Sequence, residues 1–389
     1  MMIRIASMVL FCCLLATQAA PVLANKIEIN YTPLMVSNMQ PPIAVEAVDG
    51  KSYLAYELRL TNGGGFEVKL KSLEVLDAEK KAIKTFSGND LLQIVTVARK
   101  NTTDFKPGDT GFCWITFAQD NNALAKEISH RLTYEIQGTD KADAPILNPE
   151  TIIETDKVKV DQNELVIGPP LSGKGWVAIG GIGTDTGHRR ALLSLNNKLC
   201  LSQRFANDWI KLDENNRTSN GDRKECKSYP CYEQRIISVA DGDVVDVVDV
   251  FENQIPDKPG RIKIADAGGN YAIVKIGENK YAFYAHMKKG SVKVKIGDTV
   301  SRGQEIGLVG NAGNSSGPHL HFHVCDHPSP LFANGVPFVI DQFNVEGKYK
   351  SEEEFFKADE QGKAQVIVDQ LKGKHEKQMP LAGVIVDFP

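Results

Sequence analysis

Three of the eight histidines in the sequence fall within five residues, in the run His319-Leu320-His321-Phe322-His323. Histidine alternates there with apolar residues, which predicts a β-strand with the imidazoles on one face, about 7 Å apart from one to the next. A row of imidazoles on a half-buried strand is costly unless the rings bind a metal or transfer protons. The alternative is a half-exposed strand that happens to carry histidines. The clustering favours a metal or catalytic site.

The histidine run and three segments before it resemble the zinc peptidases of the lysostaphin and LytM type, family M23. The similar segments are residues 310–324 (GNAGNSSGPHLHFHV), 297–310 (GDTVSRGQEIGLVG), 284–286 (YAH) and 237–245 (ISVADGDVV). Together they extend over about a third of the chain. The resemblance implies a mainly antiparallel β domain, one bound Zn2+ and hydrolysis of peptide bonds in peptidoglycan cross-links or stem peptides.

The resemblance also implies a set of zinc ligands, and this sequence departs from it at one position. The family holds zinc with a His and an Asp from an H-x-x-x-D segment and with the second His of H-x-H. Carried over, these imply His321 and Asp208 as ligands, but the residue four before Asp208 is Arg204. A guanidinium stays protonated and has no lone pair, so Arg204 cannot bind zinc.

One interpretation is that His188 takes the missing place. A β-hairpin turning at Asn196-Asn197 brings residues 189–195 against residues 199–209. With a three-residue loop, His188 lies on the same face as Asp208, within reach of a shared metal.

The other interpretation is that the ligand set is broken. Asp208 and His321 alone bind zinc too weakly for a lasting site. The chain is then a degenerate LytM-like protein that binds cell-wall peptide or activates another cell-wall hydrolase. We favour the first interpretation, because His286 and His319 have no chemical use in a dead site.

The family resemblance implies roles for the remaining histidines. His319 resembles the general base, and His286 would steady the oxyanion or the leaving amine. Tyr284, two residues from His286, is expected on the same strand face, as a packing residue or a lesser candidate for oxyanion help. His323 replaces a glutamate common in the family, and at about 13 Å from His319 along a strand it can only support a ligand.

The elements around these residues predict an all-β protein. Residues 25–140 have short alternating segments separated by Gly, Asn and Pro turns, which indicates a β-sandwich. That region has no cluster able to do chemistry, so we expect a spacer or a module that binds a protein partner. Residues 141–173 are expected as a linker and 174–345 as the mainly antiparallel LytM-type domain. Residues 346–389 are expected as an extension with helical patterns at 351–357 and 364–371, and an end at 381–388 that packs back on the fold.

Residues 1–24 have the pattern of a secretory signal peptide, with Arg4, a short apolar run and small residues before the cleavage site. The apolar run is shorter than the about 20 residues that span a bilayer, so we expect a periplasmic or extracellular protein without a transmembrane segment. A net charge of −4 argues against nucleic acid as a partner. Five cysteines follow the signal peptide, an odd number, and Cys226 with Cys231 is the most local pair.

Overall fold

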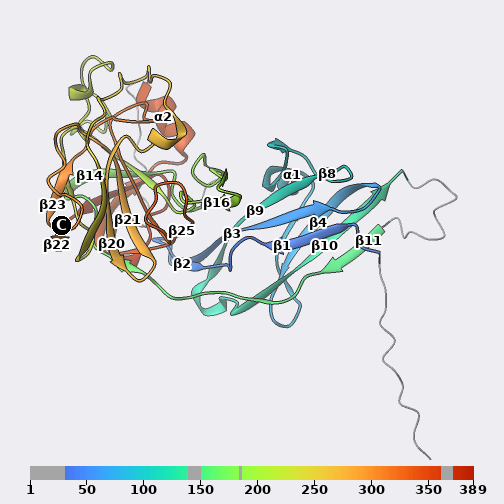
Figure 1. Ribbon diagram of the computed structural model, residues 1–389. Coiled ribbons are helices and arrows are strands. Elements are labelled where there is room, and N and C mark those ends of the chain that lie inside the picture. The colour runs from blue at the N-terminus through green and yellow to red at the C-terminus, as the bar shows by residue number, and fades with distance from the viewer. Residues whose placement is uncertain (1–30, 139–149, 184–185, 361–370) are drawn as a thin grey trace, which may run out of the picture.

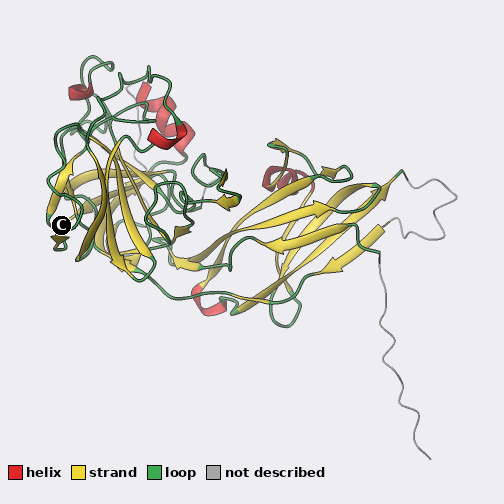
Figure 2. Ribbon diagram, in the orientation of Figure 1, coloured by secondary structure: helices red, strands yellow, loops and turns green. Residues whose placement is uncertain are grey.

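The computed structural model describes residues 31–138, 150–183, 186–360 and 371–389. Strands make up most of the regular structure of these residues, which contain two α-helices, α1 (Gly88–Ile94) and α2 (Glu352–Glu360) (Figure 2). The strands form two units that lie side by side (Figure 1). The expected all-β architecture with a short helix near the C-terminus is confirmed. The expected signal peptide, residues 1–24, lies outside the described residues.

The first unit is a β-sandwich of two six-stranded sheets. In β3 (Lys51–Asn62), residues Leu54, Tyr56, Leu58 and Leu60 alternate into the core between the sheets. The first sheet also contains β1 (Leu34–Asn38), β2 (Ala44–Glu46), β6 (Val95–Val97), β7 (Lys100–Asn101) and β9 (Thr110–Asp120). The second contains β4 (Glu67–Leu76), β5 (Ala82–Ser87), β8 (Asp104–Phe105), β10 (Glu127–Gln137), β11 (Glu150–Glu154) and β12 (Val158–Lys159).

The second unit is built on one twelve-stranded sheet. Its middle strands are β14 (Gly173–Ile179), β17 (Asn207–Lys211), β24 (Leu320–Cys325), β21 (Lys280–Met287) and β20 (Asn270–Gly277), in that order. Its other strands are β13 (Val166–Ile167), β19 (Gly242–Val248), β22 (Thr299–Val300), β25 (Gly335–Val336), β26 (Val339–Lys348), β27 (Gly373–Gln378) and β28 (Val384–Phe388). Only β13 and β26 pair in parallel among the described strands, so the expected antiparallel character is confirmed.

Two small ribbons and three 3-10 turns complete the regular structure of the described residues. The ribbons pair β15 (Leu193–Leu195) with β16 (Lys198–Cys200) and β18 (Arg235–Ile237) with β23 (Glu305–Leu308). The turns are η1 (Asn121–Ala123), η2 (Cys226–Ser228) and η3 (Ile264–Asp266).

The strands do not follow the expected linker and extension. Strands β11 and β12 fall within the expected linker, yet both pair with β10 of the sandwich. The expected extension adds β27 and β28 to the main sheet, and β28 lies between β14 and β26. The two-residue β12 and the polar β27 (GKHEKQ) have no alternation of apolar and polar residues that would indicate a strand in the sequence. Residues 139–149, where the expected sandwich meets the expected linker, and all but the last residue of the helical pattern expected at 364–371 lie outside the described residues.

Side chains of both units meet in one buried hydrophobic cluster. Val45, Val48 and Ala55 of the sandwich belong to the same buried cluster as Trp176 and Phe205 of the second unit. Buried side chains pack as densely as molecules in an organic crystal. Packing of this kind therefore holds the two units in one arrangement. No helix of the described residues is long and apolar enough to cross a membrane.

The five cysteines of the described residues are all free thiols. Cys226 and Cys231 are therefore not joined, and Cys325 is fully buried as a small apolar side chain.

Candidate metal centre

Two of the candidate ligands are set by the register of the main sheet. Asp208 of β17 lies directly opposite His321 of β24, and Asp208 also faces Ile179 of β14 on its other side. Side chains directly opposite each other in antiparallel strands point to the same face and lie about 5 Å apart at Cβ. His321 Nδ1 accordingly lies 2.8 Å from Asp208 Oδ1.

His188 reaches the same place from a loop. Its Nε2 lies 3.3 Å from the second oxygen of Asp208, Oδ2, and its ring centroid is 4.9 Å from that of His321. The ring packs against Gly180, whose φ is +74°; a Cβ there would lie 2.5 Å from His188 Nδ1. Only glycine fits at 180, both for its backbone conformation and for the space the imidazole occupies.

The route of His188 to Asp208 differs from the expected hairpin. The turn at Asn196-Asn197 is present, with positive φ at both residues as a type I′ turn requires. Its arms, however, are only the three-residue strands β15 and β16. Residues 186–192 form turns instead of continuing the arm, and β17 leaves to join β14 and β24. Hairpin register therefore does not place His188.

The three side chains fit a zinc ion. One ligand atom from each of His188, Asp208 and His321 can be chosen so that all lie within 4.8 Å of one another. Zn–N and Zn–O bonds of about 2.0–2.1 Å in a tetrahedral site separate neighbouring ligand atoms by about 3.3 Å, as between His188 Nε2 and Asp208 Oδ2. Two imidazoles and one carboxylate leave a fourth position open. Arg204 points elsewhere, to Glu57.

His323 supports His321. Its Nδ1 lies 3.0 Å from His321 Nε2, and its ring is fully buried against Phe283. When His321 offers the lone pair of Nδ1, its Nε2 carries the proton and donates it to His323. Metal-binding histidines in proteins almost always donate their other N–H in this way, which fixes the tautomer and the ring orientation.

His319 and His286 face the candidate ligands with the same tautomer. His319 Nδ1 donates to the carbonyl of Gly317 at 2.8 Å, and His286 Nδ1 donates to the carbonyl of Ala312 at 2.7 Å. Each ring then has a bare Nε2, which can accept a proton. His319 Nε2 is 3.5 Å from Asp208 Oδ1. The ring centroids of His319 and His286 are 4.7 Å apart. His286 can donate a hydrogen bond from Nε2 only after it has taken a proton.

The backbone of His286 breaks the strand alternation. Its φ is +60°, in the left-handed region that non-glycine residues rarely adopt, and such strain is typical of functional sites.

Tyr284 lies directly opposite Phe322. The backbone N–H of Val239 donates a hydrogen bond to the Tyr284 hydroxyl. Since Phe322 and His321 point to opposite faces of β24, Tyr284 lies on the face away from His321. The expectation that Tyr284 shares a face with His286 is wrong, and Tyr284 is a packing residue.

Burial and the Asp208 carboxylate set the charges of the cluster. Burial disfavours the ionised carboxylate, but His188 and His319 hold the pKa of Asp208 well below its usual range. Burial likewise opposes protonation of His188, yet Asp208 raises its pKa. Burial is the main cause that lowers the pKa of both His286 and His321, so their neutral forms are favoured. Neutral imidazole and ionised carboxylate are the forms that bind zinc.

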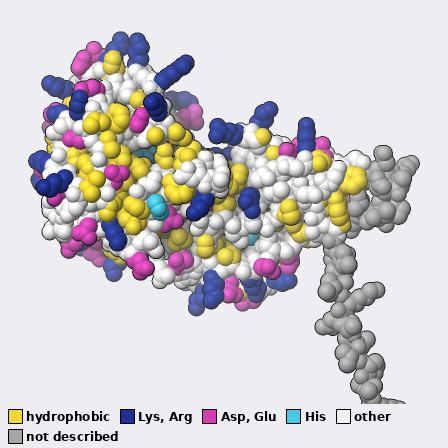
Figure 3. All heavy atoms as spheres, viewed as in Figure 1, with side chains coloured by type: hydrophobic (Ala, Val, Ile, Leu, Met, Phe, Trp, Pro, Cys, Tyr) yellow, Lys and Arg dark blue, Asp and Glu magenta, His cyan; other side chains and the backbone are white. Residues whose placement is uncertain are grey.

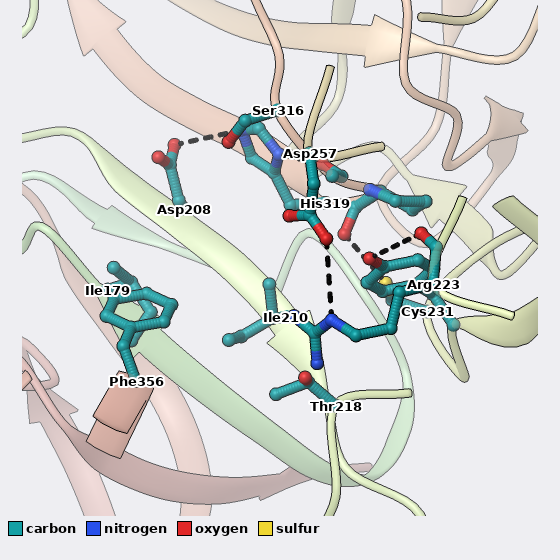
Figure 4. A pocket seen from close by; sticks show the side chains of 13 residues that line it. Ile179, Asp208, Ile210, Thr218, Arg223, Cys231, Asp257, Ser316, His319 and Phe356 are labelled. Carbon is teal, nitrogen blue, oxygen red and sulfur yellow. Dashed lines mark hydrogen bonds and ion pairs between the residues drawn. The ribbon is translucent and has the colours of Figure 1, made fainter. Parts of the chain in front are cut away.

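Two hollows meet at the candidate ligands. One is lined by His188, His286 and His321, and the other by Ile179, Ile210 and Phe356; Asp208, Ser316 and His319 line both. Figure 4 shows the second hollow, where Phe356 lies beside Ile179 and Arg223 pairs with Asp257. On the face in Figure 3, acidic and basic side chains are interspersed over both units. A chain extended through both hollows would pass directly by Asp208 and His319.

Comparison with known proteins agrees with the resemblance. Residues 229–332 match the model of Peptidase family M23. Over 65 residues, 17% of this chain, the sequence is 43% identical to the peptidoglycan DD-endopeptidase ShyA of Vibrio cholerae and 43% identical to an uncharacterized metalloprotease of Buchnera aphidicola. These matches span only 15% and 17% of the length of those relatives.

A solved structure of the catalytic domain of lysostaphin from Staphylococcus simulans is 19% identical. It aligns with 42% of this chain and 84% of its own, at a TM-score of 0.23. The family match over residues 229–332 and the matching segments confirm the resemblance of the second unit to peptidase family M23.

Proposed function

We propose that this protein is a zinc metallo-endopeptidase. The observation that carries the proposal is the convergence of His188, Asp208 and His321, whose ligand atoms lie within 4.8 Å of one another although the sequence lacks the usual histidine at 204. Zinc held there supplies a Lewis acid and a nucleophile available at neutral pH. His188, Asp208 and His321 would hold it, with His323 orienting His321.

His319 is the proposed general base. The Gly317 carbonyl fixes its proton on Nδ1 and leaves Nε2 bare beside Asp208. A base must lie within hydrogen-bond reach of the proton it takes, and His319 lines both hollows. His286 lies on the other side of the first hollow, where after protonation it would donate to the developing oxyanion or to the leaving amine.

Peptidoglycan peptide is the proposed substrate. Support comes from the relative ShyA, which is named a peptidoglycan DD-endopeptidase, and from two hollows that suit an extended peptide across Asp208 and His319. Export to the periplasm or cell exterior, expected from residues 1–24, would bring the protein to this substrate. The competing proposal is a degenerate protein that only binds cell-wall peptide or activates another hydrolase.

Zinc content separates the two proposals. The enzyme is expected to retain close to one zinc per chain after purification and dialysis, measured by atomic emission; a value near zero supports the degenerate protein. D208A and H321A are expected to lose the zinc. H319A is expected to keep it and to lose peptide hydrolysis, measured by release of new amino groups from purified peptidoglycan. H327A, at an exposed histidine outside the site, is the matched control and should keep both.

A further inference from the structure

The sandwich places a buried carboxylate against the second unit. Glu57 lies within β3 and is fully buried. It accepts hydrogen bonds from two arginines of the second unit: Arg204 donates Nε at 3.0 Å and Nη2 at 2.5 Å, and Arg189 donates Nη1. Both arginines are 5% exposed. Charged groups buried to this degree are stable only when they are paired and hydrogen-bonded.

Arg189 is held by more than the carboxylate. Its Nη2 donates to the carbonyls of Tyr56 and Ile115, at 2.9 and 3.0 Å, and its guanidinium lies 5.6 Å from the ring of Trp114. All of these partners belong to the central strands β3 and β9 of the sandwich. The planar fork of arginine suits several acceptors at once, which fixes the orientation of the side chain.

These arginines belong to the two segments that bring His188 and Asp208 to the candidate metal centre. Arg189 directly follows His188, and Arg204 precedes β17, the strand of Asp208. Asp208 and His321 are held by the sheet ladder between β17 and β24. His188 lies outside the strands of this ladder: the backbone around it forms turns, in which the Ala191 N–H donates to the carbonyl of His188.

We propose that Glu57 is a positioning residue for the metal centre: it grips Arg189 and Arg204 and so holds the His188 loop against β17. The inference rests on the proposed zinc site and gives the sandwich a role beyond that of a spacer. Arg204 occupies the position where the family has a zinc-binding histidine. Through its ion pair with Glu57 it would then help to position the metal ligands without binding the metal. Metal affinity depends on sandwich residues that never touch the metal.

Removal of the Glu57 carboxylate is expected to displace His188 from the metal centre. Without Glu57, the guanidinium groups of Arg189 and Arg204 remain buried close to each other and keep neutral acceptors such as the Tyr56 and Gly335 carbonyls and the Thr116 hydroxyl. Two like charges that lose a shared counter-ion in a low dielectric repel each other more strongly. Arg204 lies three residues before β17, which β14 and β24 hold on both sides, so the turn carrying Arg189 is the part that moves toward water. His188 moves with it.

The test uses the full chain and zinc itself. E57Q keeps the size of the side chain and removes its charge. Its zinc affinity, measured by competition with a chromophoric chelator, is expected to fall 10- to 100-fold, as for other residues that orient metal ligands. E57D, which keeps the carboxylate, is expected to recover part of the loss. R190A is the matched control, because Arg190 also reaches the sandwich, at Gln93 and Asn101, without touching Glu57; its affinity should equal that of the wild type.

A cobalt spectrum distinguishes lost positioning from general weakening of the fold. Co2+ in place of zinc should give E57Q the absorption bands of H188A, since both lack the same nitrogen ligand. Circular dichroism verifies that each variant is folded. If E57Q does not fold, R189K takes its place, because lysine keeps the charge but lacks the fork that binds Tyr56 and Ile115.

Folded E57Q or R189K with wild-type zinc affinity and a wild-type cobalt spectrum would overturn the inference and leave the enzyme proposal intact. A wild-type chain that binds no zinc would overturn both.

Discussion

The substitution G180A tests whether the His188 imidazole is where a metal ligand must be. A Cβ at residue 180 would lie 2.5 Å from His188 Nδ1, whereas a normal contact needs about 3.5 Å. The ring must therefore retreat by about 1 Å, while metal–ligand distances tolerate only about 0.2 Å. The positive φ of residue 180 adds about 1–2 kcal/mol of backbone strain for any residue with a Cβ.

We expect G180A to bind zinc at least about 10-fold more weakly and to unfold with about 1–2 kcal/mol less free energy. Chelator competition and urea unfolding measure the two effects separately. G187A is the matched control, because a Cβ at 187, next to His188, meets nothing within 4 Å. G187A should keep wild-type affinity. A folded G180A with wild-type zinc affinity would refute the placement of His188 as a ligand.

Three further predictions concern residues around this site and in the sandwich. Burial lowers the pKa of His130 to about 4, so the folded protein binds fewer protons than the unfolded chain below pH about 6.5, and the free energy of unfolding should fall by about 2 kcal/mol from pH 7 to pH 5. In urea titrations, the fall in the free energy of unfolding from pH 7 to pH 5 should be about 2 kcal/mol smaller for H130Q than for the wild type. An equal fall in both proteins would contradict the prediction. H323L removes the acceptor for His321 Nε2 and should weaken zinc binding about 10-fold; unchanged affinity in chelator competition would count against that support. F356A removes a side chain that is 47% exposed in the hollow that His319 also lines, so KM for peptide should rise while zinc affinity stays unchanged and stability changes by no more than about 0.5 kcal/mol; an unaltered KM would exclude contact with substrate.

The alternation of histidine and apolar residues was sufficient to predict β24 and the face that carries His321. That prediction worked because a two-residue period survives wherever one face of a strand is buried. Tyr284 was assigned to the wrong face for the same reason: the left-handed backbone of His286 interrupts the period. A single φ outside the strand region leaves no trace in the pattern of residue types.

The route of His188 and the use of Arg204 could not be predicted. The sequence gives no sign that a turn at 186–192 replaces a hairpin arm, since the polar and glycine residues there fit either structure. Glu57 stands in a strand of the sandwich, and its pairing with Arg189 and Arg204 spans more than 130 residues. Contacts of this kind depend on how the two units pack. Residues 54–60 (LAYELRL) contain two charged residues, the buried Glu57 and the exposed Arg59, so residue types alone do not single out Glu57 as a member of a buried ion pair.

Anomalous diffraction at the zinc edge, from crystals of the zinc-loaded full chain, tests the central claim most directly. We expect one strong peak, with His188 Nε2, an oxygen of Asp208 and His321 Nδ1 at about 2.0–2.2 Å from it. A peak that His188 does not reach, or no peak between Asp208 and His321, would contradict the metallopeptidase account.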